Sequence, residues 1–168
     1  MKKIILALLV VVLIVSMCAC GEANTSTKKT PLTSEEFTKK LEDKGYIVKD
    51  LEVVPHNDLI TDAKGTTDQD KNLKVQYYRC SVEKETKKLY KNVFDNTKVL
   101  PTSALERYTD EGENWTYLTS SDKGTYHIAM RIDDTLISGS CKEEYKEELI
   151  VLFKNLGYWV EPQPEDKK

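Results

Sequence analysis

The chain has 168 residues, of which 32% are charged and 39% hydrophobic, and its formal net charge is −3. This length fits one ordinary domain with a modest hydrophobic core. A mildly acidic surface of mixed sign argues against nucleic acid as a partner, because phosphate binding needs a basic face.

The first twenty residues have the three-part layout of a secretory signal peptide. Two lysines follow Met1, residues 4–15 are an uninterrupted apolar run, and small residues and cysteines come next. A transmembrane anchor is the alternative, but a span needs ~20 apolar residues and this run is shorter. No cluster of positive charge follows it, as a stop-transfer segment would prefer. We therefore predict a signal peptide at residues 1–19.

The sequence Ala19-Cys20-Gly21 resembles the end of a bacterial lipobox, in which a small residue precedes the lipidated cysteine. Cys20 is therefore the predicted lipidation site. Cys18 competes with it, but Cys18 follows the bulkier Met17. A diacylglyceryl anchor buries two acyl chains, and two chains hold a protein on a membrane where one binds only reversibly. We expect an extracytoplasmic protein, anchored by its lipid to the cell membrane of a Gram-positive-like cell.

Composition predicts the boundaries of the folded part. Residues 20–31 are small and polar, so we expect a flexible tether between the lipid and the domain. A single domain is expected at 32–160, followed by a disordered tail at 161–168. The domain is expected to open with a helix, because Thr33 and Glu36 form a capping box and Gly45 suits a left-handed cap at its end.

Hydrophobic periodicity predicts the remaining elements. Alternation is clearest at 73–80 and 126–132, and shorter strands are expected at 46–54, 59–61, 135–138 and from residue 115 onward. Residues 62–72 are polar and are predicted to form a loop. Helical spacing predicts a second helix at 82–94. The last helix is expected to run from a second capping box, Ser140 with Glu143, to Gly157.

These elements predict an α+β fold: an antiparallel sheet of about five to six strands with about three helices on one face. The two halves have similar patterns, each with strands, a cysteine and a capped helix, which suggests a pseudo-duplicated βββα unit. If the helices cover one face only, alternation places Tyr126, Ile128, Met130 and Ile132 beneath them. His127 and Arg131 would then point outward from the other face.

Three blocks of the chain resemble small uncharacterised lipoproteins of Gram-positive, clostridia-like bacteria. The blocks are LTSEEFTKKLEDKGYIV, VQYYRCSVEKETKKLY and YHIAMRIDDTLISGSCKEEYKEELIVLFKNLGY. In that group a helix ending in Gly-Tyr opens the domain, and an Arg-Ile-Asp-x-Thr hairpin, here residues 131–135, precedes the closing helix. The resemblance covers most of residues 32–158. It implies the fold and the extracytoplasmic location, and it implies no activity, since none is established for the group.

The sequence contains no recognisable catalytic constellation, cofactor-binding loop or metal motif. The candidate binding surface is His127 and Arg131 on the outward strand face, with Trp115 and Trp159 near element ends, where aromatic side chains suit recognition. Arg131 could instead pair with a neighbouring acid.

The two cysteines of the domain, Cys80 and Cys141, leave two interpretations open. An oxidising exterior permits a disulfide between them. The alternative is a pair of small, half-buried thiols.

The leading hypothesis is a non-enzymatic, membrane-tethered binding or accessory module of the cell envelope, with an envelope protein or polymer as its partner. The alternative is an envelope-acting enzyme whose site is assembled from distant residues such as His127, Arg131 and Asp133. A small-ligand receptor is a weaker hypothesis, because such receptors usually need two lobes around a cleft and this domain is short. No cofactor and no metal are expected.

Overall fold

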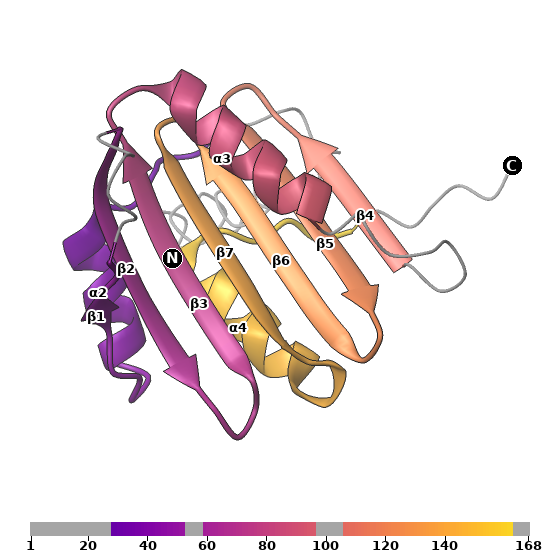
Figure 1. The fold of residues 1–168 in the computed structure, drawn as a ribbon. Helices are drawn as coiled ribbons and strands as arrows, with labels where there is room; N and C mark the ends of the chain where they lie inside the picture. Colours follow the sequence, from indigo (N-terminus) through magenta and orange to yellow (C-terminus); the bar gives the residue numbers. More distant parts are fainter. Residues whose placement is uncertain (1–27, 53–58, 97–105, 163–168) are drawn as a thin grey trace, which may run out of the picture.

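The computed structural model describes residues 28–52, 59–96 and 106–162, and both Cys18 and Cys20 lie outside them. Its centre is an antiparallel seven-stranded sheet of order β1-β2-β3-β7-β6-β5-β4 (Figure 1). The strands are β1 Lys49–Asp50, β2 Ile60–Asp68, β3 Leu73–Cys80, β4 Glu106–Glu111, β5 Trp115–Asp122, β6 Thr125–Ile132 and β7 Thr135–Lys142. The predicted α+β class with an antiparallel sheet is confirmed, although the sheet has seven strands instead of five to six.

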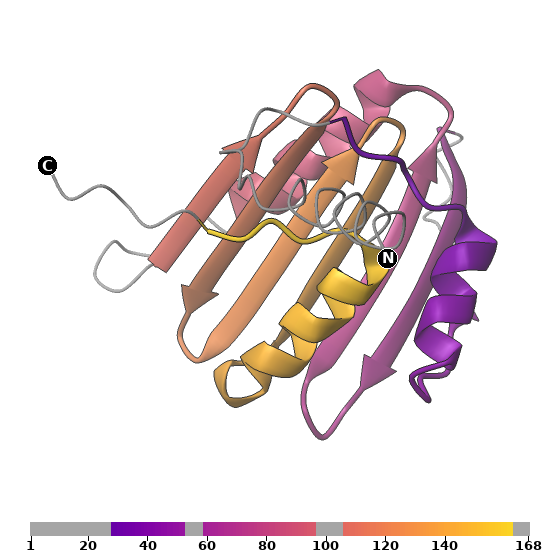
Figure 2. The ribbon, with the colours of Figure 1, turned by 180° about the vertical axis from the view of Figure 1, so that it is seen from behind.

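Helices cover both faces of this sheet. On the back face lie α2 (Ser34–Glu42) and α4 (Lys146–Leu156), the latter preceded by the short 3-10 helix η1 (Glu143–Tyr145) (Figure 2). On the front face, toward the viewer in Figure 1, α3 (Glu83–Asn96) lies across the strands. The sequence predicted all helices on one face, and the structure instead places α3 opposite to α2 and α4.

The front face attracts α3 because it has an apolar patch of its own. Leu118, Ala129 and Leu136 are buried, and the sheet register places them on the front face, opposite in parity to the back-face core. Thr86 of α3 is also fully buried. The strong alternation of β6 indicated one apolar face. Leu118, Ala129 and Leu136 form a second apolar patch on the other face.

The back-face core depends on a close approach between α4 and β7. Phe153 and Leu149 of α4 are fully buried, and they pack where β7 has Gly139. A Cβ atom at Gly139 would lie 2.8 Å from the Phe153 ring and 2.9 Å from Leu149, so only glycine admits the helix at this distance. Buried core residues of β6 complete this layer, and they are those predicted: Tyr126, Ile128, Met130 and Ile132.

The helix ends follow the predicted signals in part. Thr33 and Glu36 form the capping box of α2, with Glu36 N donating to Thr33 Oγ1 at 3.2 Å and Thr33 N donating to Glu36 Oε2 at 2.9 Å. Gly157 caps α4 in the left-handed conformation at φ 78°. The second capping box is not formed: Ser140 lies inside β7, and Glu143 accepts a hydrogen bond from Ser121 instead.

The first strands differ most from the prediction. Residues 62–72 were expected to be a loop, but β2 extends to Asp68 and pairs along its length with β3. Its buried positions are the small residues Ala63, Gly65 and Thr66. Strand β2 is therefore held by its pairing with β1 and β3. It lacks the hydrophobic alternation from which strands are predicted. Within the described residues, the strand predicted at 46–54 is reduced to β1.

The two halves share strand pairing but not helix placement. β3 and β7 pair antiparallel at the centre of the sheet, and each leads into a helix through a cysteine. A two-fold rotation that exchanges these antiparallel strands would keep both following helices on one face. Because α3 and α4 lie on opposite faces, the predicted duplication holds for the strands alone (Figures 1 and 2).

Cys80 and Cys141 do not form a disulfide. Both thiols are free and buried. Pairing of Arg79 with Thr135 and of Lys74 with Ser140 places the cysteines at opposite ends of the β3–β7 pair, about 20 Å apart. A disulfide needs Cα atoms within about 7 Å. Burial raises the pKa of Cys141 to about 11, so this thiol stays protonated and unreactive.

Phe153→Ala should lower the free energy of unfolding by about 3–5 kcal/mol, because it leaves a cavity between α4 and the sheet. Val151→Ala is the matched control on the same helix, since Val151 is 55% exposed, and it should cost less than about 1 kcal/mol. Urea denaturation of the two variants and the wild type measures both values. Similar losses in the two variants would contradict the packing described for α4.

Candidate functional site

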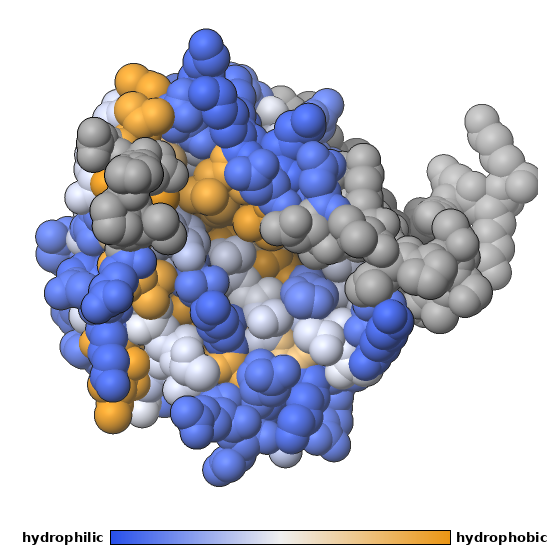
Figure 3. All heavy atoms as spheres, in the orientation of Figure 1, coloured by the Kyte–Doolittle hydropathy of each residue, from blue (hydrophilic) through white to orange (hydrophobic). Residues whose placement is uncertain are grey.

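The part of the front face that α3 leaves uncovered is hollowed by a cavity of about 300 Å³, called here the front cavity. In Figure 3, hydrophobic residues gather beside α3 and weakly polar residues lie farther from it. Strands β3, β5, β6 and β7 supply the floor, and Val93 at the end of α3 reaches the rim. The polar lining residues are Lys74, Gln76, Ser120, Asp122, His127, Ser138 and Ser140.

Sheet register brings four of these side chains into one row across the strands. Lys74 pairs with Ser140, Ser140 with His127, and His127 with Ser120. Directly opposed residues of antiparallel strands share a face and have Cβ atoms about 5 Å apart. The front cavity therefore has a polar row made of Lys74, Ser140, His127 and Ser120.

Six buried side-chain oxygen or nitrogen atoms of the described residues have no hydrogen-bond partner, and Ser120 Oγ is the one that lines the front cavity. The Ser120 side chain is 1% exposed, and its Oγ forms no hydrogen bond within the described part of the chain. A buried hydroxyl without a partner costs about 1–3 kcal/mol, because folding removes its contacts with water. A group that entered the cavity and hydrogen-bonded to Ser120 Oγ would recover that cost.

His127 contributes a neutral ring to the cavity. Burial lowers the pKa of His127 below its usual value of 6.5, and the nearby Asp122 carboxylate partly opposes this shift. At neutral pH the imidazole is therefore uncharged and offers one N–H donor and one acceptor nitrogen.

Ser120 and His127 are not joined by a hydrogen bond, although they are register partners. Such a bond is what activates a serine nucleophile. The constellation of His127, Arg131 and Asp133 is not assembled either, since four residues along β6 separate His127 from Arg131 by about 13 Å.

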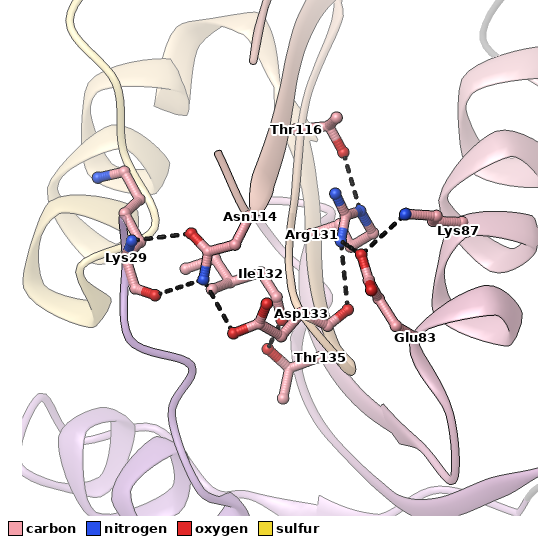
Figure 4. A network of polar contacts seen from close by, with 9 residues as sticks. All are labelled: Lys29, Glu83, Lys87, Asn114, Thr116, Arg131, Ile132, Asp133 and Thr135. Carbon is pink, nitrogen blue, oxygen red and sulfur yellow. Dashed lines mark hydrogen bonds and ion pairs between the residues drawn. The ribbon is translucent and has the colours of Figure 1, made fainter. Parts of the chain in front are cut away.

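Arg131 lies on the front face, as alternation predicted, but it is covered. Its side chain is 6% exposed beneath α3, where Nη1 donates to Glu83 Oε1 at 3.1 Å (Figure 4). Nη1 also donates to the Asp133 carbonyl at 3.3 Å, and Nε donates to Thr116 Oγ1 at 3.3 Å. The prediction of an outward-facing binding arginine is therefore wrong, and Arg131 instead pairs with an acid to hold α3 on the sheet.

The two tryptophans lie away from the front cavity. Trp115 belongs to the back-face core and is 6% exposed, with Lys29 Nζ 5.6 Å from its ring centroid. Trp159 is half-buried against Tyr117, with ring centroids 5.7 Å apart and planes at 85°. Of the four residues predicted to form one surface, only His127 lines the front cavity, so that surface does not exist as predicted.

Asn114 fixes the start of the described chain to the domain. Its buried amide nitrogen donates to the Lys29 carbonyl at 2.7 Å, and Lys29 N donates to Asn114 Oδ1 at 2.9 Å (Figure 4). The same amide nitrogen donates to Asp133 Oδ2 at 2.8 Å. The predicted tether at 20–31 therefore includes residues that contact the domain. At the other end, Glu161 of the predicted tail forms an ion pair with Lys154 at 2.7 Å.

Sequence reasoning missed most of the cavity. Lys74, Gln76, Ser120 and the two serines of β7 are ordinary strand residues when each is considered alone. Only the order and register of four strands place them together. No local spacing in the sequence identifies such a set, because its members come from elements far apart in the chain.

Neither membrane spans nor metal sites are found within residues 28–52, 59–96 and 106–162. None of the helices there has the length and apolar composition of a span. No group of three or more His, Cys, Asp or Glu side chains in those ranges is arranged to hold a metal ion.

No protein-family model matches the chain, and no curated protein matches it. The crystal structure of a GTP binding regulator from Thermotoga maritima is similar, with a TM-score of 0.46 and 18% identity over 74% of this chain and 84% of that one. A likeness of this degree carries no argument about function.

Acidification should destabilise the protein through His127. Because its pKa is lowered in the folded state, the unfolded chain takes up the proton first as the pH falls below about 6.5. This contribution to stability is fully present above that pH and is lost as the pH falls toward the folded-state pKa. Between about pH 7 and pH 5, His127→Gln should lose less unfolding free energy than the wild type in urea denaturation. Equal losses would mean that burial does not perturb this ring.

Proposed function

We propose that this chain is a non-enzymatic binding module of the cell envelope, anchored to the membrane through a lipid on Cys20, and that its ligand occupies the front cavity. The anchor is supported by the basic start, apolar run and Ala-Cys-Gly ending of the first 21 residues. The binding role is supported by the cavity. Its volume lies at the lower end of the range found for small-molecule sites, about 300–1,000 Å³.

The single observation that carries the binding role is the unpartnered, buried hydroxyl of Ser120 in a cavity lined by further polar groups. Buried polar groups in folded proteins are nearly always hydrogen-bonded, so one without a partner needs an explanation. A ligand group that accepts or donates at Ser120 supplies one. The same observation favours binding over hydrolysis, since a Ser120 that lacks a bond to His127 is not prepared to act as a nucleophile.

The front cavity also revives the small-ligand receptor hypothesis in a different form. Two lobes are not needed here, because one wall of the cavity is the sheet and another is the end of α3. The ligand is then a small molecule or the free end of an envelope polymer, which suits a cavity of this size better than a broad protein surface does.

The lipid anchor has a direct test. Cys20→Ser should release or mislocalise the protein, because it removes the acylated thiol. Cys18→Ser is the matched control and should leave the protein in the membrane fraction. Mass spectrometry of the mature N-terminus should find acyl groups on Cys20. Acyl groups on Cys18, or an uncleaved N-terminus, would contradict the assignment.

Binding at the front cavity is tested by NMR titration of the full ¹⁵N-labelled chain in detergent. Three probes represent different chemistry: tetra-alanine, glycerol 3-phosphate and N-acetylglucosamine. At least one should shift the amide signals of Ser120 and His127, which line the cavity. Ser138→Leu places a bulky group in the cavity and should remove those shifts, whereas Ser81→Leu, at an exposed position outside it, should not. If no probe shifts the cavity signals, the proposed function is wrong.

A further inference from the structure

We infer that the front cavity binds a dipolar, linear ligand, namely a short peptide with free ends, whose carboxylate lies at Lys74 and whose ammonium lies at Asp122. This inference rests on the proposed function and specifies the ligand of the same site.

The first argument is the pair of opposite charges on the lining. Lys74 lies on β3 and Asp122 at the end of β5, and both line the front cavity. Neither has an ion-pair partner within the described residues. A ligand with the reverse pair of charges is attracted at both ends, while a purely anionic ligand is repelled by Asp122 and a purely cationic one by Lys74. Attraction and repulsion together select a dipolar ligand.

The distance between these charges sets the length of the ligand. Three inter-strand steps separate β3 from β5, and Asp122 lies two residues beyond the polar row, so the backbones at the two positions are about 15 Å apart. Both side chains line the cavity, so the charges of a molecule bound between them lie closer together than the two backbones, roughly 10–13 Å apart. An extended peptide rises about 3.3 Å per residue, so three to four residues fill this distance.

The uncharged lining between the ends suits a peptide backbone. Hydroxyls at Ser120 and Ser140, the amide of Gln76 and the neutral ring of His127 each offer donors and acceptors, which match peptide C=O and N–H groups. Ser120 Oγ is the one that is buried and unpartnered. The described lining has no Phe, Tyr or Trp against which a sugar ring could stack.

A second cavity strengthens the positive end. Its volume is about 350 Å³, and it shares Lys74 and Gln76 with the front cavity while adding Lys49. Lys49 also has no ion pair within the described residues, whereas its neighbour Asp50 is paired with Lys64 at 2.5 Å. The junction of the two cavities is therefore the more positive end, and this orients the carboxylate of the peptide toward β3.

Calorimetric titration of the full chain in detergent with four peptides tests both ends. The probes are tetra-alanine, its N-acetyl form, its C-terminal amide and the doubly blocked peptide. Tetra-alanine should bind, and blocking either end should weaken binding ~tenfold, because one charge pair is lost each time. Lys74→Gln should make tetra-alanine and its amide bind equally. Asp122→Asn should do the same for tetra-alanine and its N-acetyl form.

The control variant is Lys84→Gln, an exposed lysine of α3 outside the cavity lining, which should keep all four affinities unchanged. Failure of tetra-alanine to bind, or affinities that do not depend on its free ends, would overturn the inference. If glycerol 3-phosphate or N-acetylglucosamine still shifted the cavity signals in the NMR titration, the proposed binding function would stand without the dipolar ligand. If no probe shifted them, both would fall.

Discussion

The close approach of α4 to β7 at Gly139 is the constraint on which the rest of the structure depends. Gly139 faces the back, where its missing side chain lets Phe153 and Leu149 rest against the strand. Its two chain neighbours, Ser138 and Ser140, alternate to the front and line the cavity there. The helix on the back face therefore holds the strand that supplies the centre of the front cavity. Core packing on the back face and the candidate site on the front face therefore depend on the same strand, β7.

On the front, α3 decides which part of the sheet stays accessible. The fourteen residues of α3 span about 21 Å. A single helix of this length is too small to cover the whole face of a seven-stranded sheet. The pair between Arg131 and Glu83 fixes the first turn of α3 above the end of β6. The last turn brings Val93 to the rim of the front cavity. Because this contact holds the helix near the end of β6, the described residues leave the other part of the front face open, where polar side chains lie beside Leu118 and Ala129.

Local patterns predicted the elements whose signal is local. The capping box of α2, the alternation of β6 and the apolar face of α4 are each contained within a few turns or one strand, and the structure has all three. Strand β2 was missed because its buried positions are small residues, so its pairing partners and not its hydrophobicity make it a strand. Amphipathicity shows that α3 must pack on something, but it does not say on which face of a sheet.

The site was less predictable than the fold, for a related reason. Alternation correctly placed His127 and Arg131 on the same face. Their surroundings differ because α3 covers Arg131, whereas His127 lines the front cavity. Ser120 becomes notable only when it is both buried and without a partner, and neither property follows from its sequence neighbours. The bond between Asn114 and Lys29 joins positions 85 residues apart and has no sequence signature.

That bond between Asn114 and Lys29 has a mechanical consequence. Among the described residues, a force applied from the N-terminal side first meets the fold at the start of β5, where two hydrogen bonds join Lys29 to the Asn114 side chain. His127 and Asp122 lie toward the opposite end of the β5–β6 hairpin, about 20 Å and about 26 Å farther along the strands. The two hydrogen bonds between Lys29 and Asn114 would bear the load first and break before any strand is strained. A domain pulled at this point therefore yields at its attachment while the geometry of the cavity is preserved.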